Sequence, residues 1–571
     1  MTFERGAGAL AILLASCTFG PLPDSAPRSE PARPIGWVDS VGEVPPAPRV
    51  AVPTARSDDD TRPLPRISLL PETLPPFRWL VTEHVGQWTA RGSNHVEPLG
   101  FTGTDLGVSF AHQGELWFLF GDSQSVFDDC RDSLASSPLA PLPVDALPEL
   151  TWTKRPNGLF EPLQAPGLEL GCMNVPVEGV SLGDRAYVFF AAGWSEELQR
   201  HSSSALTHTS APGAEPLQLD HLVESAKFIN VSAVVEGEYV YIWGSGEFRK
   251  SDVYLARVHS TALADRAAWE YFRGWSPLGA QFGPDEASAT PLVSAGCVGE
   301  LSARKHPQLG LYMLAYNCEK PRGVFLRTAT NPAGPYSAPI QLFEPWRDEG
   351  YEHFIHGAPF FTAGRDDGLS DPGREAESGG EYGAYLVPQW FSEEGPGLHS
   401  VVYTLSSWNP YQVHVMRTLL ADVTGPWLPP AEREPHAPDG MVMLSAGDAA
   451  FSEVGTWRHA GDGGSMSAAS DGLLVMSSEV PPLGAAATGT LSRDFSVDAS
   501  VSTLEFDIQG SEAEVLLMAD DEVVRRARGH GDGFWWPVVF HLEELRGRHL
   551  RLALYDRSTT AFIAVRNPQL R

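Results

Sequence analysis

Cysteine, positive charge and long apolar runs are all scarce in this sequence. Its 571 residues include 5 cysteines, and 41 Lys and Arg stand against 72 Asp and Glu, which gives a formal charge of −31. Phosphate backbones and anionic lipid head groups repel such a chain, so we expect no nucleic-acid partner. After the N-terminus no apolar stretch is long enough for a membrane helix, so we expect membrane attachment only through a lipid.

Signatures of other enzyme classes are also missing. The sequence has no His-Glu-x-x-His pair, Walker loop or dinucleotide fingerprint, which argues against zinc proteases and nucleotide-dependent enzymes. It has no CxxC pair, so zinc is disfavoured, and we expect no metal and no cofactor. No segment has a sustained helical period, which disfavours an α/β fold. The chain is instead rich in glycine (55), proline (48) and tryptophan (16), as is typical of a turn-rich, all-β protein.

The N-terminus has the pattern of an export signal. Arg5 lies in a short polar start, the apolar run 9–14 follows, and small residues lead to Cys17. Residues 14–17 (Leu-Ala-Ser-Cys) resemble the lipobox of bacterial lipoproteins, in which the cysteine is lipidated and becomes the mature N-terminus. We therefore expect 1–17 to be a lipoprotein signal peptide, and the protein to be exported and anchored through Cys17 in the cell envelope. A plain secretory signal with an incidental cysteine is the alternative.

The next segment, 18–76, is rich in Pro, Ser, Ala and Arg and poor in aromatic residues. It cannot bury a core, so we expect a disordered tether between the lipid and the folded part.

Four cysteines remain, an even number in an exported chain, which predicts two disulfides. Four cysteines allow three connectivities. Because Cys297 and Cys318 bracket one expected hairpin, we favour pairing these two, and Cys130 with Cys172.

One strand pattern recurs along 77–433: a first strand, a turn containing glycine, and an aromatic second strand. The copies begin about 50 to 75 residues apart, which suits four-stranded propeller blades with loop insertions. Five copies predict a five-bladed β-propeller. They run from Thr104 to Phe120, Glu178 to Phe190, Asn230 to Trp243, Gly299 to Tyr316 and, more loosely, His356 to Val387.

The remainder, 434–571, reads as a second all-β unit. Apolar and polar residues partly alternate in its strands, as in a sandwich with one buried face. Residues 545–548 and 554–559 resemble the galactose-binding-like, jelly-roll sandwiches appended to many glycan enzymes. Such a module either holds sugar or braces the propeller.

The innermost strand of each blade lines the central channel, so the residues that open the repeats should converge there. These residues are Asp105, Glu178, Asn230, Glu300 and His356. Asp122 joins them, since Gly121 lets the chain turn sharply toward the channel mouth. Hydrolysis of a glycosidic bond needs one protonated and one ionised carboxyl, which such a pocket supplies. Alternatively, these acids only satisfy turns and backbone amides.

Several ordered motifs resemble the domain-of-unknown-function family 4185, part of which is classed as glycoside hydrolase family 183. The resemblance spans roughly Phe77 to Leu420, and the long insertion from Gln124 to Met173 departs from it. It implies an endo-D-arabinanase on a five-bladed propeller with two catalytic aspartates, which fall by motif on Asp105 and Asp122. The motifs are Thr104-Asp105-Leu106-Gly107, Leu119-Phe120-Gly121-Asp122-Ser123, Trp243-Gly244-Ser245-Gly246 with Arg249, Gly299-Glu300-Leu301-Ser302 and Ser407-Trp408-Asn409-Pro410-Tyr411.

Three further residues are candidates for substrate binding. Arg249 offers a fork of donors for sugar hydroxyls or a salt bridge at a blade edge. Trp408 offers a stacking surface or packed core. His356 either polarises a carboxylate or water, or is structural.

Two functions from different classes remain open. The first is a monomeric exported lipoprotein that hydrolyses a polysaccharide by an inverting mechanism, with Asp105 and Asp122 as the acid and base and Glu300 assisting. The second is a surface glycan-binding or scaffold lipoprotein without turnover.

Overall fold

The computed structural model describes residues 71–90, 96–125, 130–143, 146–319, 321–351, 353–356, 379–423 and 441–447, a few residues between 357 and 378, and most of 457–571. The expected signal peptide, Cys17, nearly all of the tether and the joint near 435 lie outside these residues. In the described part every helix is a short 3-10 turn and all other elements are strands. None of its helices has the length and apolarity to cross a membrane.

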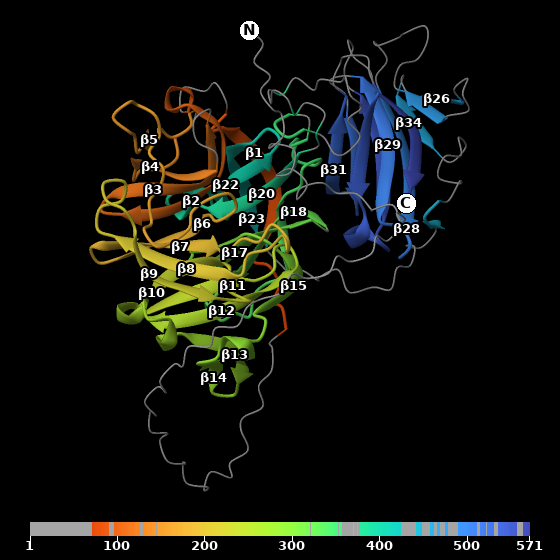
Figure 1. Cartoon of the computed structure of the whole chain (residues 1–571). Coiled ribbons are helices and arrows are strands. Elements are labelled where there is room, and N and C mark those ends of the chain that lie inside the picture. Colours follow the sequence, from red (N-terminus) through yellow and green to blue (C-terminus); the bar gives the residue numbers. More distant parts are fainter. Residues whose placement is uncertain are drawn as a thin grey trace, which may run out of the picture. The chain divides into compact units, whose positions relative to one another are not determined.

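Five sheets follow one another along the first part of the chain (Figure 1). Most have four strands, each antiparallel to its neighbour, and the third sheet is extended. The sheets are β2 (Phe101–His112), β3 (Glu115–Ser125), β4 (Arg131–Pro138), β5 (Thr151–Trp152); β6 (Pro176–Leu182), β7 (Arg185–Ala192), β8 (Ser203–Thr209), β9 (Gln218–Glu224); β10 (Asn230–Glu236), β11 (Tyr239–Ser245), β12 (Ser251–His259), β13 (Glu270–Ser276), β14 (Gly279–Gly283), with β15 (Val293–Val298) beside β12; β16 (Leu301–Lys305), β17 (Tyr312–Glu319), β18 (Arg322–Ala329), β19 (Ile340–Phe343); and β20 (Gly380–Leu386), β22 (Leu398–Trp408), β23 (Gln412–Asp422), β1 (Phe77–Gln87), with β21 (Ser392–Gly395) beside β22.

The first strands of these sheets form a closed ring. β2 contacts β6, β6 contacts β10, β10 contacts β16, β16 contacts β20, and β20 returns to β2. Sheets arranged around such a ring make a β-propeller, with the first strand of each sheet at the hub. The fifth sheet is completed at its outer edge by strand β1, which pairs with β23 from Phe77 opposite Asp422 to Gln87 opposite His414.

Burial along the strands explains why these sequences fold this way. Nearly every residue of β2 is buried, because neighbouring sheets cover both of its faces. Aromatic side chains fill the space between sheets, and the Trp88 ring packs edge-on against Phe118 at 4.7 Å. Each large apolar side chain buried in this way contributes roughly 1.5–3 kcal/mol.

The fifth repeat begins later than the sequence predicted. We expected its inner strand to open at His356, but the inner strand is β20, Gly380–Leu386. His356 lies before this strand, where its N–H donates to the Asn409 carbonyl and its carbonyl accepts from Gly379, both at 3.0 Å. Glu381 therefore stands near the start of the fifth inner strand, the place expected for His356.

The C-terminal part folds as a β-sandwich of two sheets. One contains β24 (Met443–Leu444), β25 (Arg458–Gly461), β28 (Gly489–Val497), β30 (Glu514–Ala519), β31 (Glu522–Arg528) and β33 (Leu550–Asp556), and the other contains β26 (Ser465–Ala468), β27 (Leu474–Ser477), β29 (Thr503–Gly510), β32 (Trp536–His541) and β34 (Ile563–Leu570). Buried and partly exposed residues alternate strictly along β29, so only one face of this strand is covered. The chain is thus all-β, with a propeller followed by a sandwich, as predicted.

Both described cysteine pairs are disulfide-bonded. Cys130 pairs with Cys172 at a Cα–Cα distance of 4.6 Å, and Cys297 pairs with Cys318 at 5.2 Å. These are the pairings favoured from the sequence.

Candidate active site

Asp105 lies where the first inner strand is irregular. The register of β2 against β3 shifts on both sides of Asp105, and Leu106 has a φ of 69°, a left-handed conformation that is strained for leucine. Asp105 is paired with Gly121 across the sheet. A Cβ atom at Gly121 would lie 2.7 Å from Asp105 Oδ1, so only glycine leaves room for this carboxylate. The Tyr382 hydroxyl from β20 donates to Asp105 Oδ2 at 2.8 Å.

Asp122 follows Gly121 and is turned by a second irregularity. In a regular strand its side chain would point to the opposite face from its neighbour. The register of β3 against β4 shifts between Phe120 and Ser123, and Asp122 has a φ of 39°. The Met173 N–H lies 2.9 and 3.1 Å from the two carboxylate oxygens of Asp122. Because Met173 follows the disulfide-bonded Cys172, the insertion that we singled out in the sequence holds this carboxylate in place.

Asp132, on β4, is a third acid that the sequence analysis missed. Its Oδ1 accepts the backbone N–H of Asp122 at 3.3 Å. The side chain is buried, and within the described residues its Oδ2 has no hydrogen-bond partner. Asp132 lies inside the insertion, to which the sequence analysis assigned no strand, and the pairing of β3 with β4 brings it beside Asp122.

Burial raises the pKa values of all three aspartates, and nearby negative charge adds to the shift of Asp105 and Asp132. Burial, and then the negative charge of Asp122, raises the pKa of Asp105 to about 8, against the Tyr382 hydrogen bond. Burial raises the pKa of Asp122 to about 7, and the Met173 N–H opposes this shift. The pKa of Asp132 is raised well above its ordinary value by burial and by Asp122. Burial disfavours the charged form of a carboxyl, and so does a second negative charge nearby.

Glu300 lies immediately before β16 and belongs to the same group of acids. Its charge contributes to the raised pKa of Asp105. The pKa of Glu300 is itself raised by burial, against the positive charge of Arg249. Arg249 donates to Glu319 at 2.6 Å, so the salt bridge considered for this arginine is present, with Glu300 close by. The structure thus brings Asp105, Asp122, Glu300 and Arg249 together.

Glu178 lies apart from this group in its contacts. Its carboxylate forms a bidentate ion pair with Arg304, at 2.5 and 2.9 Å, and also accepts from Ser232 and from the N–H groups of Gly179 and Ala233. These five donors occupy both oxygens, so Glu178 ties inner strands together rather than facing a substrate. This differs from the substrate-binding role that we expected. Asn230, at the start of β10, is buried, with 6% of its surface exposed.

The other expected binding residues have structural contacts. His356 is fully buried and bridges Asn409 and Gly379 through its backbone. Trp408 is partly exposed, and the Arg374 guanidinium lies over its ring at 4.7 Å from the centroid. The ring also meets Tyr411 edge-on at 5.6 Å.

One Gly-x-Ser-x-Gly spacing occurs, at 179–183. In a serine hydrolase this motif forms a strand-to-helix turn. Ser181 instead lies within strand β6 of the β6–β7 hairpin, one residue before the strand ends, and its hydroxyl hydrogen-bonds to His112 Nδ1 at 2.8 Å. The spacing therefore does not mark a nucleophile elbow.

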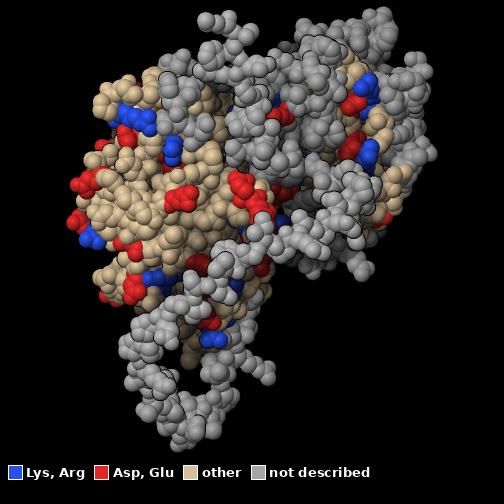
Figure 2. Space-filling model, in the orientation of Figure 1, with Lys and Arg blue, Asp and Glu red and all other residues tan. Residues whose placement is uncertain are grey.

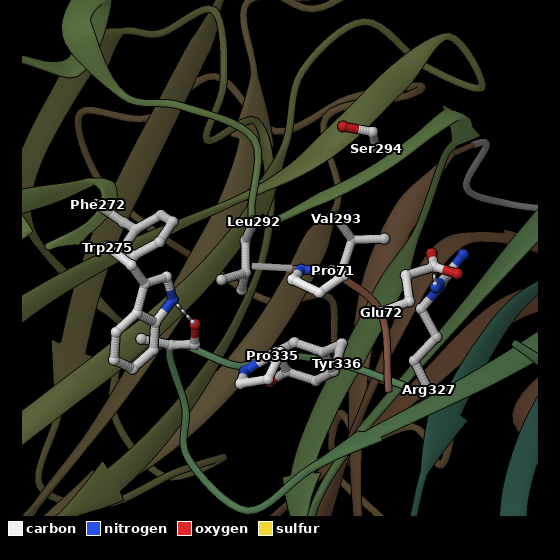
Figure 3. A pocket seen from close by; sticks show the side chains of 11 residues that line it. Pro71, Glu72, Phe272, Trp275, Leu292, Val293, Ser294, Arg327, Pro335 and Tyr336 are labelled. Atoms are coloured by element: carbon white, nitrogen blue, oxygen red, sulfur yellow. Dashed lines mark hydrogen bonds and ion pairs between the residues drawn. The ribbon is translucent and has the colours of Figure 1, made fainter. Parts of the chain in front are cut away.

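Two cavities lie away from the acids. A cavity of about 210 Å³ lies under the first described residues, where Glu72 forms an ion pair with Arg327 and the Trp275 indole donates to the Ala333 carbonyl (Figure 3). A second, of about 270 Å³, lies at the carboxyl ends of the inner strands, the far end of the channel from Asp105. No Asp or Glu lines the second cavity, so neither cavity contains a pair of acids.

Acidic and basic side chains are interspersed over the face of the molecule in view in Figure 2. On that face the described residues form no continuous basic surface.

The fold and the site define an all-β propeller whose hub gathers acids. Residues 91–417 match the family described as Domain of unknown function (DUF4185), and the chain belongs to this family. No curated protein matches the chain.

Solved structures with a similar fold include an exo-β-1,3-galactanase from Phanerochaete chrysosporium (10% identity, 86% of this chain, 100% of that chain, TM-score 0.36). They also include an α-L-arabinofuranosidase from Podospora anserina (10% identity, 61% and 98% covered, TM-score 0.35). A third is a GH43_1 enzyme from Xanthomonas citri (12% identity, 58% and 92% covered, TM-score 0.33).

Proposed function

We propose that this protein is a glycoside hydrolase that cleaves a polysaccharide with Asp105 and Asp122. The observation that carries the proposal is a pair of buried carboxyls at the hub whose pKa values are both raised and whose hydrogen-bond partners differ. A buried carboxyl without a cationic partner is costly for folding and is found mainly at functional sites.

The unequal hydrogen bonding assigns the two roles. The Asp122 carboxylate accepts a backbone N–H that lies within 3.1 Å of both oxygens, which favours its ionised form. Asp105 accepts from the Tyr382 hydroxyl, but burial and the charge of Asp122 raise its pKa to about 8, above the value of about 7 for Asp122, which favours the protonated form. Asp105 is therefore the general acid and Asp122 the general base.

These roles make a complete hydrolysis. Protonated Asp105 gives its proton to the glycosidic oxygen as the bond to the anomeric carbon breaks. Ionised Asp122 takes a proton from water as the water oxygen attacks that carbon from the opposite face, so the configuration inverts. Glu300 assists by adding negative charge that keeps Asp105 protonated. Proton NMR of the first product separates inversion from retention.

The resemblance to endo-D-arabinanases supports D-arabinan as the substrate, and the negative charge of the chain suits a neutral polysaccharide. The test incubates purified protein with D-arabinan and measures new reducing ends. We expect oligosaccharide products that disappear with Asp105→Asn. Products that persist in this variant would rule the proposal out.

The second candidate is a glycan-binding or scaffold protein without turnover. It is favoured by the low accessibility of the acids, of which Asp105 is 7% and Asp122 9% exposed. Calorimetry measures the binding of D-arabinan, and the reducing-end assay measures its hydrolysis. Binding without hydrolysis would support the glycan-binding or scaffold protein.

We also propose that the protein is exported and anchored in the cell envelope through lipid at Cys17. Labelling of cells with a radioactive fatty acid tests this. The wild-type protein should carry the label, and Cys17→Ser should not.

A further inference from the structure

A partly exposed tryptophan lies close to the acid pair at the edge of the second sheet. Trp194 follows β7, whose pairing continues beyond β6, because Val175 and Ala191 exchange backbone hydrogen bonds of 3.1 and 3.0 Å. Past that pair, the Trp194 N–H donates to Asn174 Oδ1 at 3.0 Å. The residue before Asn174 is Met173, whose N–H holds the Asp122 carboxylate. Two adjacent residues therefore connect Trp194 to Asp122.

The indole is held in one orientation by two neighbours. Its Nε1–H donates to Glu196 Oε1 at 3.0 Å, and the His201 ring lies at 5.0 Å with an interplanar angle of 59°. His201 Nε2 is 2.5 Å from the Met173 carbonyl oxygen. A carbonyl only accepts, so Nε2 carries the proton, and Nδ1 of the neutral ring is an acceptor. The Trp194–His201 pair is thus fastened to the same residue as Asp122.

Hydrogen bonds within the loop that carries Trp194 hold its conformation without a ligand. Gly193 has a φ of 68°, and a Cβ there would lie 2.5 Å from Ser202 Oγ, so the turn requires glycine. The Ser195 N–H donates to the Arg200 carbonyl at 3.0 Å. A binding side chain held on such a loop loses little conformational entropy when it meets its ligand.

Two other aromatic residues, Trp408 and Phe248, differ from Trp194 in having an arginine over the ring. The Arg374 guanidinium lies over the Trp408 ring at 4.7 Å, and that of Arg249 lies over the Phe248 ring at 4.6 Å. Among the described residues, no lysine or arginine lies over the ring of Trp194. An indole is the largest aromatic surface, apolar on its faces and polar at its N–H, which suits a sugar with an apolar C–H face and a rim of hydroxyls.

We propose that Trp194 is the stacking platform of a sugar-binding subsite beside Asp122, with His201 Nδ1 accepting a hydrogen bond from a ring hydroxyl. This inference rests on the proposed function for the identity of its ligand, a neutral furanose or pyranose unit of the polysaccharide. It adds a specificity-determining residue outside the motifs that identify the family.

The test measures binding of D-arabinan oligosaccharides by calorimetry in the full-length Asp105→Asn protein, in which hydrolysis is blocked. Adding Trp194→Ala should raise Kd about tenfold, and adding Trp194→Phe should raise it less, because a smaller ring remains. The matched control is Leu198→Ala, which removes an apolar side chain, 57% exposed, from the same loop and should leave Kd unchanged. An unchanged Kd in Trp194→Ala would overturn the inference.

Kinetics in the otherwise wild-type enzyme separate this inference from the proposed function. Trp194→Ala should raise KM with little change in kcat, since stacking holds ground state and transition state alike. Wild-type protein that binds in a Trp194-dependent way but yields no reducing ends would refute the hydrolase and support the platform. Hydrolysis that depends on Asp105 with an unchanged KM in Trp194→Ala would support the hydrolase and refute the platform. If Trp194→Ala does not fold, Trp194→Phe decides, and a KM equal to wild type counts against the platform.

Discussion

Two buried acids on inner strands of the propeller, Glu178 and Asp105, have opposite surroundings. Only 1% of Glu178 and 7% of Asp105 is exposed. Glu178 faces the Arg304 guanidinium and accepts from five donors. Asp105 receives the Tyr382 hydroxyl, and its carboxyl lies beside those of Asp122, Asp132 and Glu300.

This is the difference that we expect between a structural carboxylate and the general acid that we propose. The Arg304 guanidinium, a hydroxyl and two backbone N–H groups surround the Glu178 carboxylate, so this residue joins strands. The charge of Asp105 has no such partner, so its proton is retained near neutral pH and is available for transfer. Both acids lie on inner strands at the hub. They differ in their partners, which are the Arg304 guanidinium for Glu178 and the Tyr382 hydroxyl for Asp105.

Removing the charge and the proton of Asp105 tests the difference between the two acids most strongly. Asp105→Asn should lower the rate of hydrolysis about 1000-fold, since an amide cannot donate the proton. The free energy of unfolding should not fall, because the change removes a buried acid next to Asp122. Reducing-end assays and urea unfolding measure the two effects. A variant that retains a tenth of the wild-type rate would contradict the role of Asp105.

The corresponding substitution at Glu178 should lower the free energy of unfolding. Glu178→Gln leaves the Arg304 charge buried without a partner, so the free energy of unfolding should fall by about 3 kcal/mol. The matched control is Glu236→Gln, which breaks an ion pair with Lys305 whose side chains are 38% and 37% exposed. That control should cost less than about 1 kcal/mol. Equal effects at both sites would show that burial of the pair does not matter.

Asp122 depends on the insertion for its hydrogen bond, so loosening the insertion should weaken the acid pair. Replacing Cys130 and Cys172 by serine together should lower kcat about tenfold, because the Met173 N–H is no longer held against the carboxylate. Replacing Cys297 and Cys318 by serine serves as the control for disulfide loss and should lower kcat less. If both double variants behave alike, the bond to Met173 has no special role.

The pKa values predict a narrow pH optimum. Hydrolysis needs Asp122 ionised, which requires a pH above about 7, and Asp105 protonated, which requires a pH below about 8. The kcat/KM profile should therefore be bell-shaped, with its maximum between these values and about a tenfold fall for each pH unit outside the two limbs. An acidic limb near 4 would show that Asp122 has an ordinary pKa.

The stability of the native state should follow the same groups. Both pKa values are raised in the folded protein from 3.8, so their stabilising contribution is complete below 3.8 and is lost as the pH rises through 7 and 8. In urea unfolding, the free energy of unfolding of the wild-type protein should fall as the pH rises from about 4 to about 8. It should fall less in Asp105→Asn. A steeper fall in the variant would reverse the assigned sign.

The repeat pattern allowed much of the fold to be predicted, because each blade carries the same local signal in β2 and β3, β6 and β7, or β10 and β11. The fifth repeat failed because its inner strand, Gly380–Leu386, lies far beyond His356, and the intervening residues break the spacing. A pattern of period two locates strands but carries no information on the length of the loop between them.

At the candidate site, the sequence located the acids that lie within the family motifs. It did not locate the residues whose surroundings depend on contacts with distant strands. Asp105 and Asp122 lie within motifs. The burial of Asp132 and the Tyr382 hydroxyl depend on strand pairing over 10 and 277 residues of sequence separation, which a linear pattern does not reveal. Glu178 was misassigned because Arg304, 126 residues away in the sequence, decides its role.

Strand β1 belongs to the last sheet although it comes first along the chain, and Thr82 meets Thr418 at a separation of 336 residues. During synthesis the fifth sheet therefore cannot be completed until the ribosome has passed Asp422, whereas the four earlier sheets do not contain β1. Because β1 comes early in the chain and β23 comes late, their pairing is a long-range contact, which slows folding of the fifth sheet. A force applied to the chain before Phe77 would first meet the contacts of Glu72 with Arg327 and of Thr73 with Tyr336 in the fourth blade, and strand β1 only after these had broken.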